Sequence, residues 1–231
     1  MIITVANNKE GIGKSTIAVN IATLRAMVGR SVLLIDLDPK KSSFDWSRAR
    51  ECANIQPHIP ARSIMGKHLE AEIGGIVPGY NDIVIDATWR NTRGAQAALE
   101  MADMVVVPVS IHDGSVENLK QVVRRIKVAR RANPGLWALV VITHAEGVLP
   151  ISELDKIRHY IGKIPSTALA GTVIRKRGSL QQAFSEGLSI FEYKPADPLA
   201  MAEMHDLYRA QKRRHARVPS LSQLQKYADG L

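Results

Sequence analysis

A short segment near the amino terminus has the residue types and the spacing of a phosphate site. It reads Gly11-Ile12-Gly13-Lys14-Ser15-Thr16 and lies between an apolar, β-branched run and a stretch with helical periodicity. Glycines let backbone N–H groups turn toward an anion, and the dipole of the following helix adds to the attraction. Lys14 supplies a point charge for phosphate, and Ser15 is in position to place its hydroxyl on Mg²⁺. The segment therefore predicts a site for a nucleotide phosphate chain.

Three aspartates follow other apolar runs and can serve the same site. Asp36 and Asp38 come at the end of the second run, and Asp86 ends the third. Carboxylates at the carboxyl ends of strands that face a phosphate site can hold the waters of a metal ion or orient a nucleophile. We therefore assign Ser15, Asp36 and Asp86 to a Mg²⁺ site.

The chain must contain elements that bring these residues together, and its periodicity supplies them. Apolar, nearly continuous runs are typical of strands buried on both faces, and here they alternate with amphipathic stretches. This alternation predicts an α/β fold, a mostly parallel twisted sheet flanked by helices on both faces, with ligands at the carboxyl ends of the strands. We expect strands over residues 2–5, 31–35, 83–85, 104–107 and 139–142, a further strand within 61–65, and helices over 14–28, 42–51, 92–101, 115–132 and 151–161.

The composition excludes several other classes. The single cysteine, Cys52, which we expect to be a buried or half-buried thiol, rules out an internal disulfide framework and a cysteine-ligated cluster within one chain. The longest apolar run, Leu136 to Ile142, is far shorter than the roughly 20 residues of a membrane span. The histidines lack metal-ligand spacing, and no nucleophile elbow points to a serine hydrolase. We expect a soluble, cytoplasmic protein.

The order of these motifs resembles that of the ParA/MinD family of deviant Walker ATPases. That family's loop reads Lys-Gly-Gly-x-Gly-Lys-Ser/Thr, and Lys9 stands at its first lysine. Its second motif, Asp-x-Asp-Pro-Gln, is similar to the segment from Asp36 to Lys40. The segments 42–49, 102–109 and 186–193 resemble further family segments, so that the similarity covers about residues 1–210.

The resemblance implies a P-loop NTPase of the deviant Walker type that uses ATP/ADP and Mg²⁺. The nucleotide would be held by Lys9 and by the loop from Gly11 to Thr16. Lys9 would reach across an ATP-dependent homodimer to the partner's phosphates, and Asp38 would lie near the γ-phosphate and the attacking water. Lys9, Lys14 and Asp38 are thus the expected catalytic residues, and Asp36 is expected in the shell of Mg²⁺-bound water.

The sequence departs from an ordinary P-loop at one residue and from the family pattern at others. Asn8 stands where an ordinary P-loop has glycine, and Glu10 replaces a glycine that lies where two monomers approach. Residues 89–91, Trp-Arg-Asn, replace a small and proline-rich switch. We expect Glu10 either to weaken or alter dimerisation or to be neutralised by a basic partner residue, and hydrolysis to be slow, weak or dependent on a partner.

The net charge of +9, from 31 lysines and arginines against 22 acids, favours a polyanionic partner. The expected helix over 115–132 carries a basic stripe of Lys120, Arg124, Lys127 and Arg131 behind an apolar face. A second cluster, Arg175-Lys176-Arg177, lies where ParA-type proteins carry basic residues for non-specific DNA, and the run 212–217 extends the basic surface. We expect sequence-independent binding of double-stranded DNA through phosphate contacts, although a solvated helix face would have the same pattern.

We divide the chain into an ATPase domain, residues 1–217, and a C-terminal tail, residues 218–231. The tail has leucines and a tyrosine near helical spacing, and this small apolar face favours docking on the body or on a partner over membrane insertion.

The function that we expect is an ATP-dependent, nucleoid-associated ATPase that positions a plasmid or other DNA and is stimulated by a centromere-binding adaptor. Two alternatives remain: an ATPase of this family that serves conjugative transfer or places a protein cluster, and a nucleotide-switched binding module whose hydrolysis is very weak because of Glu10. The nitrogenase iron protein of the same superfamily is excluded, since it needs several cluster cysteines.

Overall fold

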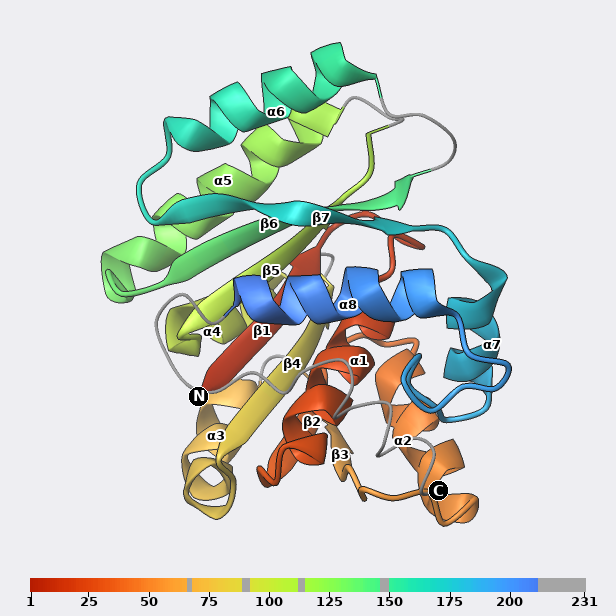
Figure 1. Ribbon diagram of the computed structural model, residues 1–231. Helices are drawn as coiled ribbons and strands as arrows, with labels where there is room; N and C mark the ends of the chain where they lie inside the picture. Colours follow the sequence, from red (N-terminus) through yellow and green to blue (C-terminus); the bar gives the residue numbers. More distant parts are fainter. Residues whose placement is uncertain (66–67, 89–91, 112–114, 146–149, 212–231) are drawn as a thin grey trace.

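The computed structural model describes residues 1–65, 68–88, 92–111, 115–145 and 150–211. Within these ranges the chain builds one parallel sheet of seven strands in the order β3-β2-β4-β1-β5-β6-β7 (Figure 1). The strands are β1 (Ile2–Asn7), β2 (Val32–Asp36), β3 (Ala61–Ser63), β4 (Asp82–Thr88), β5 (Met104–Val109), β6 (Trp137–Ala145) and β7 (Thr167–Arg175).

Helices cover both faces of this sheet (Figure 1). One apolar core joins the sheet to α3 (Leu69–Ile76), α4 (Thr92–Met101), α5 (Ser115–Ala132) and α6 (Ile151–Gly162), and a short 3-10 turn, η2 (Val77–Gly79), follows α3. The other core joins it to α1 (Lys14–Met27), α2 (Ser42–Cys52), α7 (Gly178–Ser185) and α8 (Pro198–Ala210). Because the central strands are buried on both sides, they read as continuous apolar runs.

The order of the strands places the predicted site at a switch point of the sheet. From β1 the chain passes to β2, which lies beyond β4 on one side of β1, and from β4 it passes to β5 on the other side of β1. In the β2–β4 ladder Asp36 is the neighbour of Asp86, and Asp86 is also paired in register with Val5 of β1. The carboxyl ends of the three strands therefore lie together, which is where open α/β sheets bind ligands.

The expected fold class is confirmed, and the structure adds elements that the sequence pattern did not reveal. β7 was not expected, because small residues such as Ala170 and Gly171 interrupt its β-branched residues. The helices α3 and α7 were also not expected. The prediction that Cys52 is buried or half-buried is wrong, because it is the exposed last residue of α2. Residues 89–91, the basic run 212–217 and the tail 218–231 lie outside the described residues.

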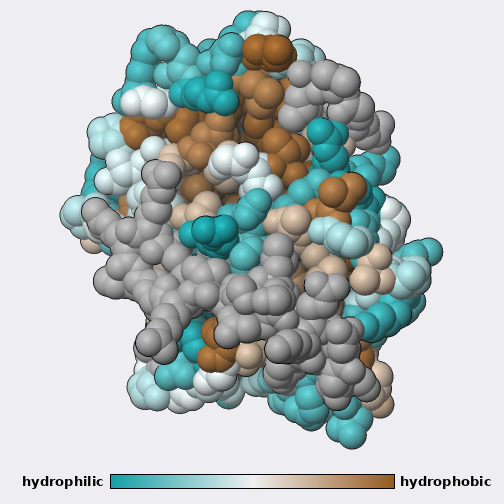
Figure 2. Space-filling model, viewed as in Figure 1, coloured by the Kyte–Doolittle hydropathy of each residue, from teal (hydrophilic) through white to brown (hydrophobic). Residues whose placement is uncertain are grey.

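The edge of the sheet at β7 leaves some apolar side chains partly uncovered. Figure 2 shows brown apolar surface in the upper half of the view, where α5, α6 and β7 lie in Figure 1. Leu169 and Val173 of β7 are only partly buried, and Ile151 at the start of α6 is 75% exposed. None of the helices in the described ranges is long and apolar enough to cross a bilayer.

A buried ion pair ties α2 to the segment that precedes α8. The guanidinium of Arg50 donates to both carboxylate oxygens of Glu192, at 2.9 and 2.6 Å, and both side chains are almost fully buried. Trp46 of α2 donates from its indole to the carbonyl of Leu188, at 3.1 Å. The segment 186–193, which resembles the ParA/MinD pattern, thus packs against α2, which contains the similar segment 42–49, and holds the middle and the end of this helix in place.

Candidate nucleotide-binding site

The phosphate loop connects β1 to α1, and local geometry explains its glycines. Gly11 and Gly13 have φ angles of 67° and 85°, in the left-handed region that side chains disfavour. Asn7, the buried last residue of β1, donates from its amide to the carbonyl of Pro108 (2.6 Å) and accepts from the backbone N–H of Lys9 (3.1 Å). The start of the loop is therefore anchored to the neighbouring strand β5.

Lys14 is the first residue of α1 and is buried. Its ammonium donates to the carbonyl of Lys9 at 2.9 Å, so the side chain folds back along the loop. This brings one positive charge to the helix N-terminus, where the helix dipole also favours an anion. Lys9 and Lys14, the two lysines of the predicted motif, are thus held next to each other by the loop itself.

Asp86 is the most perturbed carboxylate of the site. It is fully buried, and neither of its oxygens has a hydrogen bond of ordinary geometry with a described residue. Burial, and next the negative charge of Asp36, raise the pKa of Asp86 to about 7, while Ser15 and Lys14 act in the opposite direction. A buried carboxylate without partners is costly, so a cation or a proton is expected to satisfy it.

Asp36 has a different environment, because its oxygens hold the next loop. One oxygen accepts from the backbone N–H of Asp38 (2.9 Å), and the other accepts from the N–H and the hydroxyl of Ser43 (2.9 and 2.8 Å) and from the N–H of Phe44 (3.0 Å). Burial raises the pKa of Asp36, and these hydrogen bonds partly offset the shift. The geometry makes Asp36 the residue that fixes the turn carrying Asp38 and the first turn of α2.

The turn from Asp36 to Lys41 faces the phosphate loop through an ion pair. Asp38 is half-buried and accepts from the backbone N–H of Lys40 at 3.0 Å. The ammonium of Lys40 lies 3.2 Å from a carboxylate oxygen of Glu10. A basic residue therefore does face Glu10, and it comes from the same chain.

The oxygen donors of the site fit Mg²⁺. The orphaned carboxylate of Asp86 lies near the hydroxyl of Ser15, and hard oxygen ligands of this kind suit that ion. The described residues contain no group of three or more His, Cys, Asp or Glu side chains placed to hold a metal. Mg²⁺ in nucleotide sites usually takes one or two protein ligands and completes its shell with phosphates and water.

The predicted DNA-binding stripe lies on α5, and three of its four side chains are exposed. Arg124, Lys127 and Arg131 are exposed, and Leu119, Val123 and Ile126 on the other face are buried as expected. Lys120 forms an ion pair with Glu117, at 2.9 Å. Arg130, beside the stripe, donates to the carbonyls of residues 136, 165 and 166 and has a structural role.

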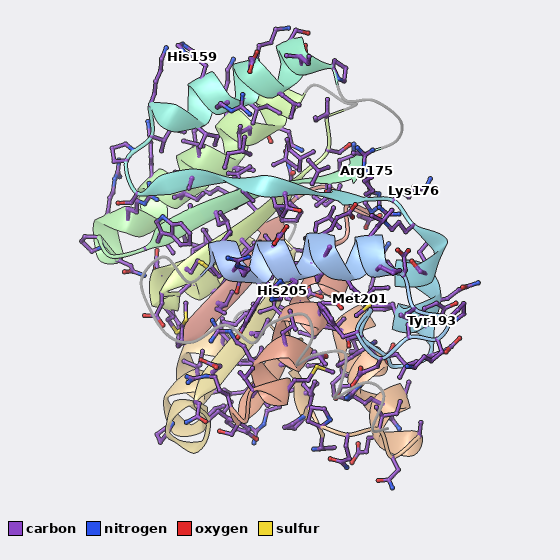
Figure 3. All side chains as sticks on the ribbon, viewed as in Figure 1. His159, Arg175, Lys176, Tyr193, Met201 and His205 are labelled. Atoms are coloured by element: carbon purple, nitrogen blue, oxygen red, sulfur yellow. The ribbon has the colours of Figure 1, made fainter. Side chains whose placement is uncertain are left out.

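The second basic cluster lies at the carboxyl end of β7. Figure 3 shows Arg175, the last residue of β7, and Lys176 at this end of the strand. Lys176 is exposed, but Arg177 forms an ion pair with Glu203 of α8 at 2.7 Å. This cluster belongs to the layer of α7 and α8, whereas the stripe belongs to the layer of α5 and α6. The two basic regions therefore lie in different layers of the fold.

Three residues near the phosphate loop were not predicted from the sequence. His144 of β6 has a φ angle of 52°, and a Cβ added at Gly13 would lie 3.5 Å from its Nε2 atom. The hydroxyl of Thr143 is buried and has no hydrogen-bond partner among the described residues. Gln121 of α5 accepts from the amide of Asn8 at 3.2 Å. The first two stand at the end of an expected strand, so inspection of every strand end would have found them.

The comparisons with known proteins agree with this geometry. A family model for the CobQ/CobB/MinD/ParA nucleotide-binding domain matches residues 3–190. The chromosome-partitioning ATPase Soj of Thermus thermophilus is 26% identical over 230 residues, which cover 87% of this chain and 91% of Soj. The maintenance of carboxysome distribution protein A of Halothiobacillus neapolitanus is 26% identical over 194 residues, 82% of this chain and 86% of that protein. An ATP complex of a Cyanothece McdA variant shares the fold, with a TM-score of 0.69 and 12% identity, over 94% of this chain and 98% of that one.

Proposed function

The chain belongs to the CobQ/CobB/MinD/ParA family of nucleotide-binding domains, and from this premise we propose that it is a Mg²⁺-dependent ATPase that associates with DNA and positions a cargo. The observation that carries the proposal is the buried, unpartnered carboxylate of Asp86 beside Ser15 and Lys14, at the carboxyl edge of the sheet. A divalent cation bound to nucleotide phosphates would satisfy that carboxylate.

Each residue of the site has a task in this proposal. The backbone of Gly11 to Thr16 and the ammonium of Lys14 hold the phosphates of ATP or ADP. Ser15 and Asp86 hold Mg²⁺, which neutralises charge that develops on the transferred phosphoryl group. Asp38 orients the attacking water, and Asp36 fixes the turn from which Asp38 acts. Lys9 is assigned to the partner's phosphates in an ATP-dependent homodimer.

The DNA-related part of the proposal is supported by the exposed basic stripe. Arg124, Lys127 and Arg131 lie on one side of α5 and are available to phosphates of any sequence. We assign to the chain sequence-independent binding of double-stranded DNA in its ATP-bound state, with a nucleoid-associated location. A plasmid is the cargo that we propose, with a centromere-binding adaptor that stimulates slow hydrolysis.

Two observations favour related functions. The similarity to a carboxysome-distribution protein over 82% of the chain favours placement of a protein cluster as the second candidate. The ion pair of Glu10 with Lys40 ties the phosphate loop to the Asp38 turn, and this favours a nucleotide-switched module that hydrolyses ATP very slowly.

The experiment that tests the proposal measures two activities of the purified full chain. Multiple-turnover release of phosphate from Mg-ATP, with and without random duplex DNA, tests the enzyme. Binding of the same DNA with ATP, with ADP and without nucleotide tests the switch. Lys14→Ala and Asp38→Ala are expected to abolish turnover, and Lys14→Ala also abolishes ATP-dependent DNA binding. DNA binding that is equal in all three nucleotide states would refute the positioning function. Hydrolysis of no more than one ATP per chain would instead support the nucleotide-switched module.

A further inference from the structure

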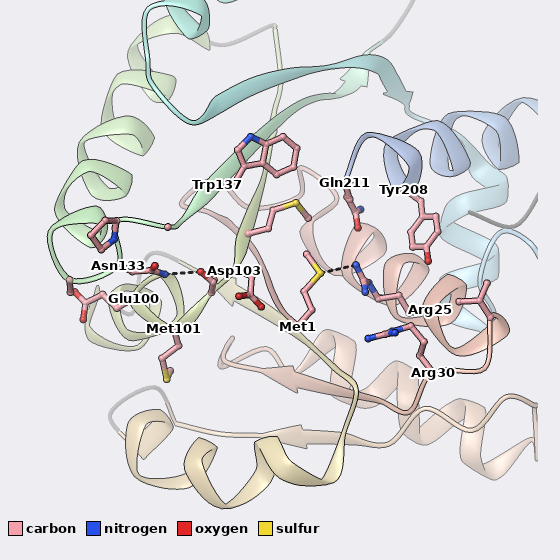
Figure 4. Close-up of a pocket in the computed structure, with 16 residues that line it drawn as sticks. Met1, Arg25, Arg30, Glu100, Met101, Asp103, Asn133, Trp137, Tyr208 and Gln211 are labelled. Carbon is pink, nitrogen blue, oxygen red and sulfur yellow. Dashed lines mark hydrogen bonds between the residues drawn. The ribbon is translucent and has the colours of Figure 1, made fainter. Parts of the chain in front are cut away.

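A second cavity lies at the edge of the sheet opposite the phosphate loop. Its volume is about 640 Å³, and its walls come from the beginnings of strands: Met1 before β1, Asp103 and Met104 at β5, and Trp137 of β6 (Figure 4). Arg25 of α1 and Tyr208 of α8 close another side. The size is within the range of pockets that bind small organic ligands.

Two buried polar groups in this cavity have no partner in the described part of the chain. Gln211 is only 4% exposed, and neither the nitrogen nor the oxygen of its side-chain amide has a hydrogen bond. The Nε atom of Arg25 is likewise unpartnered, although the guanidinium pairs with Asp82 at 3.0 Å. Figure 4 shows the Gln211 side chain pointing from the end of α8 toward Arg25 and Met1. Buried groups of this kind are normally satisfied, so they indicate a ligand.

Three other polar side chains around the cavity are already committed to the fold. Asn133 donates to the carbonyl of Ala102 at 2.7 Å, and Asp103 accepts from the backbone N–H of Ile2 at 2.7 Å. Arg30 pairs with Asp82. Among the described residues, the cavity thus combines methionine and tryptophan side chains with two unpartnered polar groups, the Nε of Arg25 and the amide of Gln211, which offers a donor and an acceptor side by side.

We propose that this cavity is a second ligand site, separate from the phosphate loop, that binds a purine base or nucleoside of the adenine type. A glutamine amide pairs in two places with the adenine edge, where an amino group and a ring nitrogen lie side by side. The indole of Trp137 and the sulfur atoms of Met1 and Met104 suit the faces of a flat ring. The amide of Gln211 forms hydrogen bonds with the edge of the adenine ring, and Arg25 donates from Nε to a further acceptor of the ligand.

Isothermal titration of the full chain with adenosine, in saturating Mg-ADP, tests this site. The ADP titration alone reports on the phosphate loop, so failure there is distinguished from failure of the cavity. We expect one further equivalent of adenosine per chain, and we expect Gln211→Leu to weaken it at least roughly tenfold. The same change at an exposed glutamine of α7, Gln182→Leu, leaves adenosine binding unchanged.

A second comparison uses the natural chain and needs no variant. Purine riboside has the shape of adenosine but lacks the 6-amino group, so it offers Gln211 no donor. We expect it to bind roughly tenfold more weakly than adenosine, and we expect the difference to vanish in Gln211→Leu. Absence of a second binding event, equal affinities of the two nucleosides for the natural chain, or an unchanged affinity in a folded Gln211→Leu would each overturn the proposal. If another part of the chain fills the cavity, no second binding event will be seen.

Discussion

The ammonium of Lys40 lies 3.2 Å from the carboxylate of Glu10, and this pair joins the phosphate loop to the turn that carries Asp38. Both residues depart from the family pattern, which has glycine at position 10 and glutamine at position 40. The two departures compensate each other in charge, so Glu10 does not leave an unbalanced negative charge beside the phosphates. Both side chains are largely exposed, at 63% for Lys40 and 42% for Glu10, so the pair adds little to stability. We expect the pair instead to couple the motion of the phosphate loop to that of the Asp38 turn.

Glu10→Gly is expected to strengthen ATP-dependent dimerisation, because it removes both a side chain at the proposed monomer contact and the link to Lys40. Sedimentation velocity with a non-hydrolysable ATP analogue measures this, and the free energy of unfolding is expected to change by less than about 1 kcal/mol. Glu10→Gln is the matched control, since it removes the charge and keeps the bulk. If Glu10→Gly and the natural chain dimerise identically, Glu10 has no part in assembly.

Asp86→Asn is expected to stabilise the protein without nucleotide at alkaline pH. The pKa of Asp86 is about 7 in the folded protein and near 3.8 when unfolded, so between these values the folded state binds the extra proton. The free energy of unfolding therefore falls as pH rises through this window, by up to about 1.4 kcal/mol per pH unit. Because asparagine carries no charge, the variant does not lose stability as the pH rises through this window.

Urea denaturation at pH 5 and pH 8 measures the effect. The natural chain is expected to be less stable at pH 8, and Asp86→Asn is expected to exceed it there by on the order of 2–4 kcal/mol. Mg-ATP is expected to reduce this difference in stability at pH 8, because it binds the folded natural chain more tightly than the folded variant. The same pH dependence in both proteins would show that another group is responsible.

Local chemistry explains why the phosphate loop and the sheet were predictable and the rest was not. Gly13 and Lys14 act through their own backbone angle and charge, which any strand-to-helix turn of this sequence would produce. The pairing of Asp36 with Asp86 follows from the rule for parallel sheets. In contrast, the ion pair of Glu10 with Lys40 and the hydrogen bond of Asn8 with Gln121 join segments far apart in the chain, and no periodicity encodes them. β7 was missed because Ala170 and Gly171 interrupt its β-branched residues, although it pairs with β6 in the sheet.

Arg50→Ala is expected to destabilise the fold by about 3–5 kcal/mol, because it leaves the carboxylate of Glu192 buried without its partner. Urea denaturation measures the loss. Arg48→Ala removes an exposed arginine from the same helix and is expected to cost less than about 0.5 kcal/mol. The double variant Arg50→Met with Glu192→Leu is expected to recover much of the stability, because it removes both charges. A loss below about 1 kcal/mol for Arg50→Ala would contradict this account of the pair.

Replacement of Arg124, Lys127 and Arg131 by alanine is expected to weaken binding of random duplex DNA and to reduce its salt dependence. Each cation that no longer neutralises a DNA phosphate lowers the slope of log affinity against log salt by about 0.9, so three such cations predict a reduction of roughly 2–3. The three side chains are exposed on α5, and their removal is expected to leave the fold intact. Fluorescence anisotropy with ATP at several salt concentrations measures the slope.

The matched control removes the same charge from the neighbouring helix. Lys156 and Arg158 of α6 are exposed and already paired with Glu153 and Asp155, and Lys163 follows the end of that helix. Their replacement by alanine is expected to leave the salt slope nearly unchanged. If both triple variants reduce DNA affinity equally, the net charge of +9 acts as a whole and no stripe exists. If the α5 variant binds like the natural chain, its basic side chains form only a solvated face.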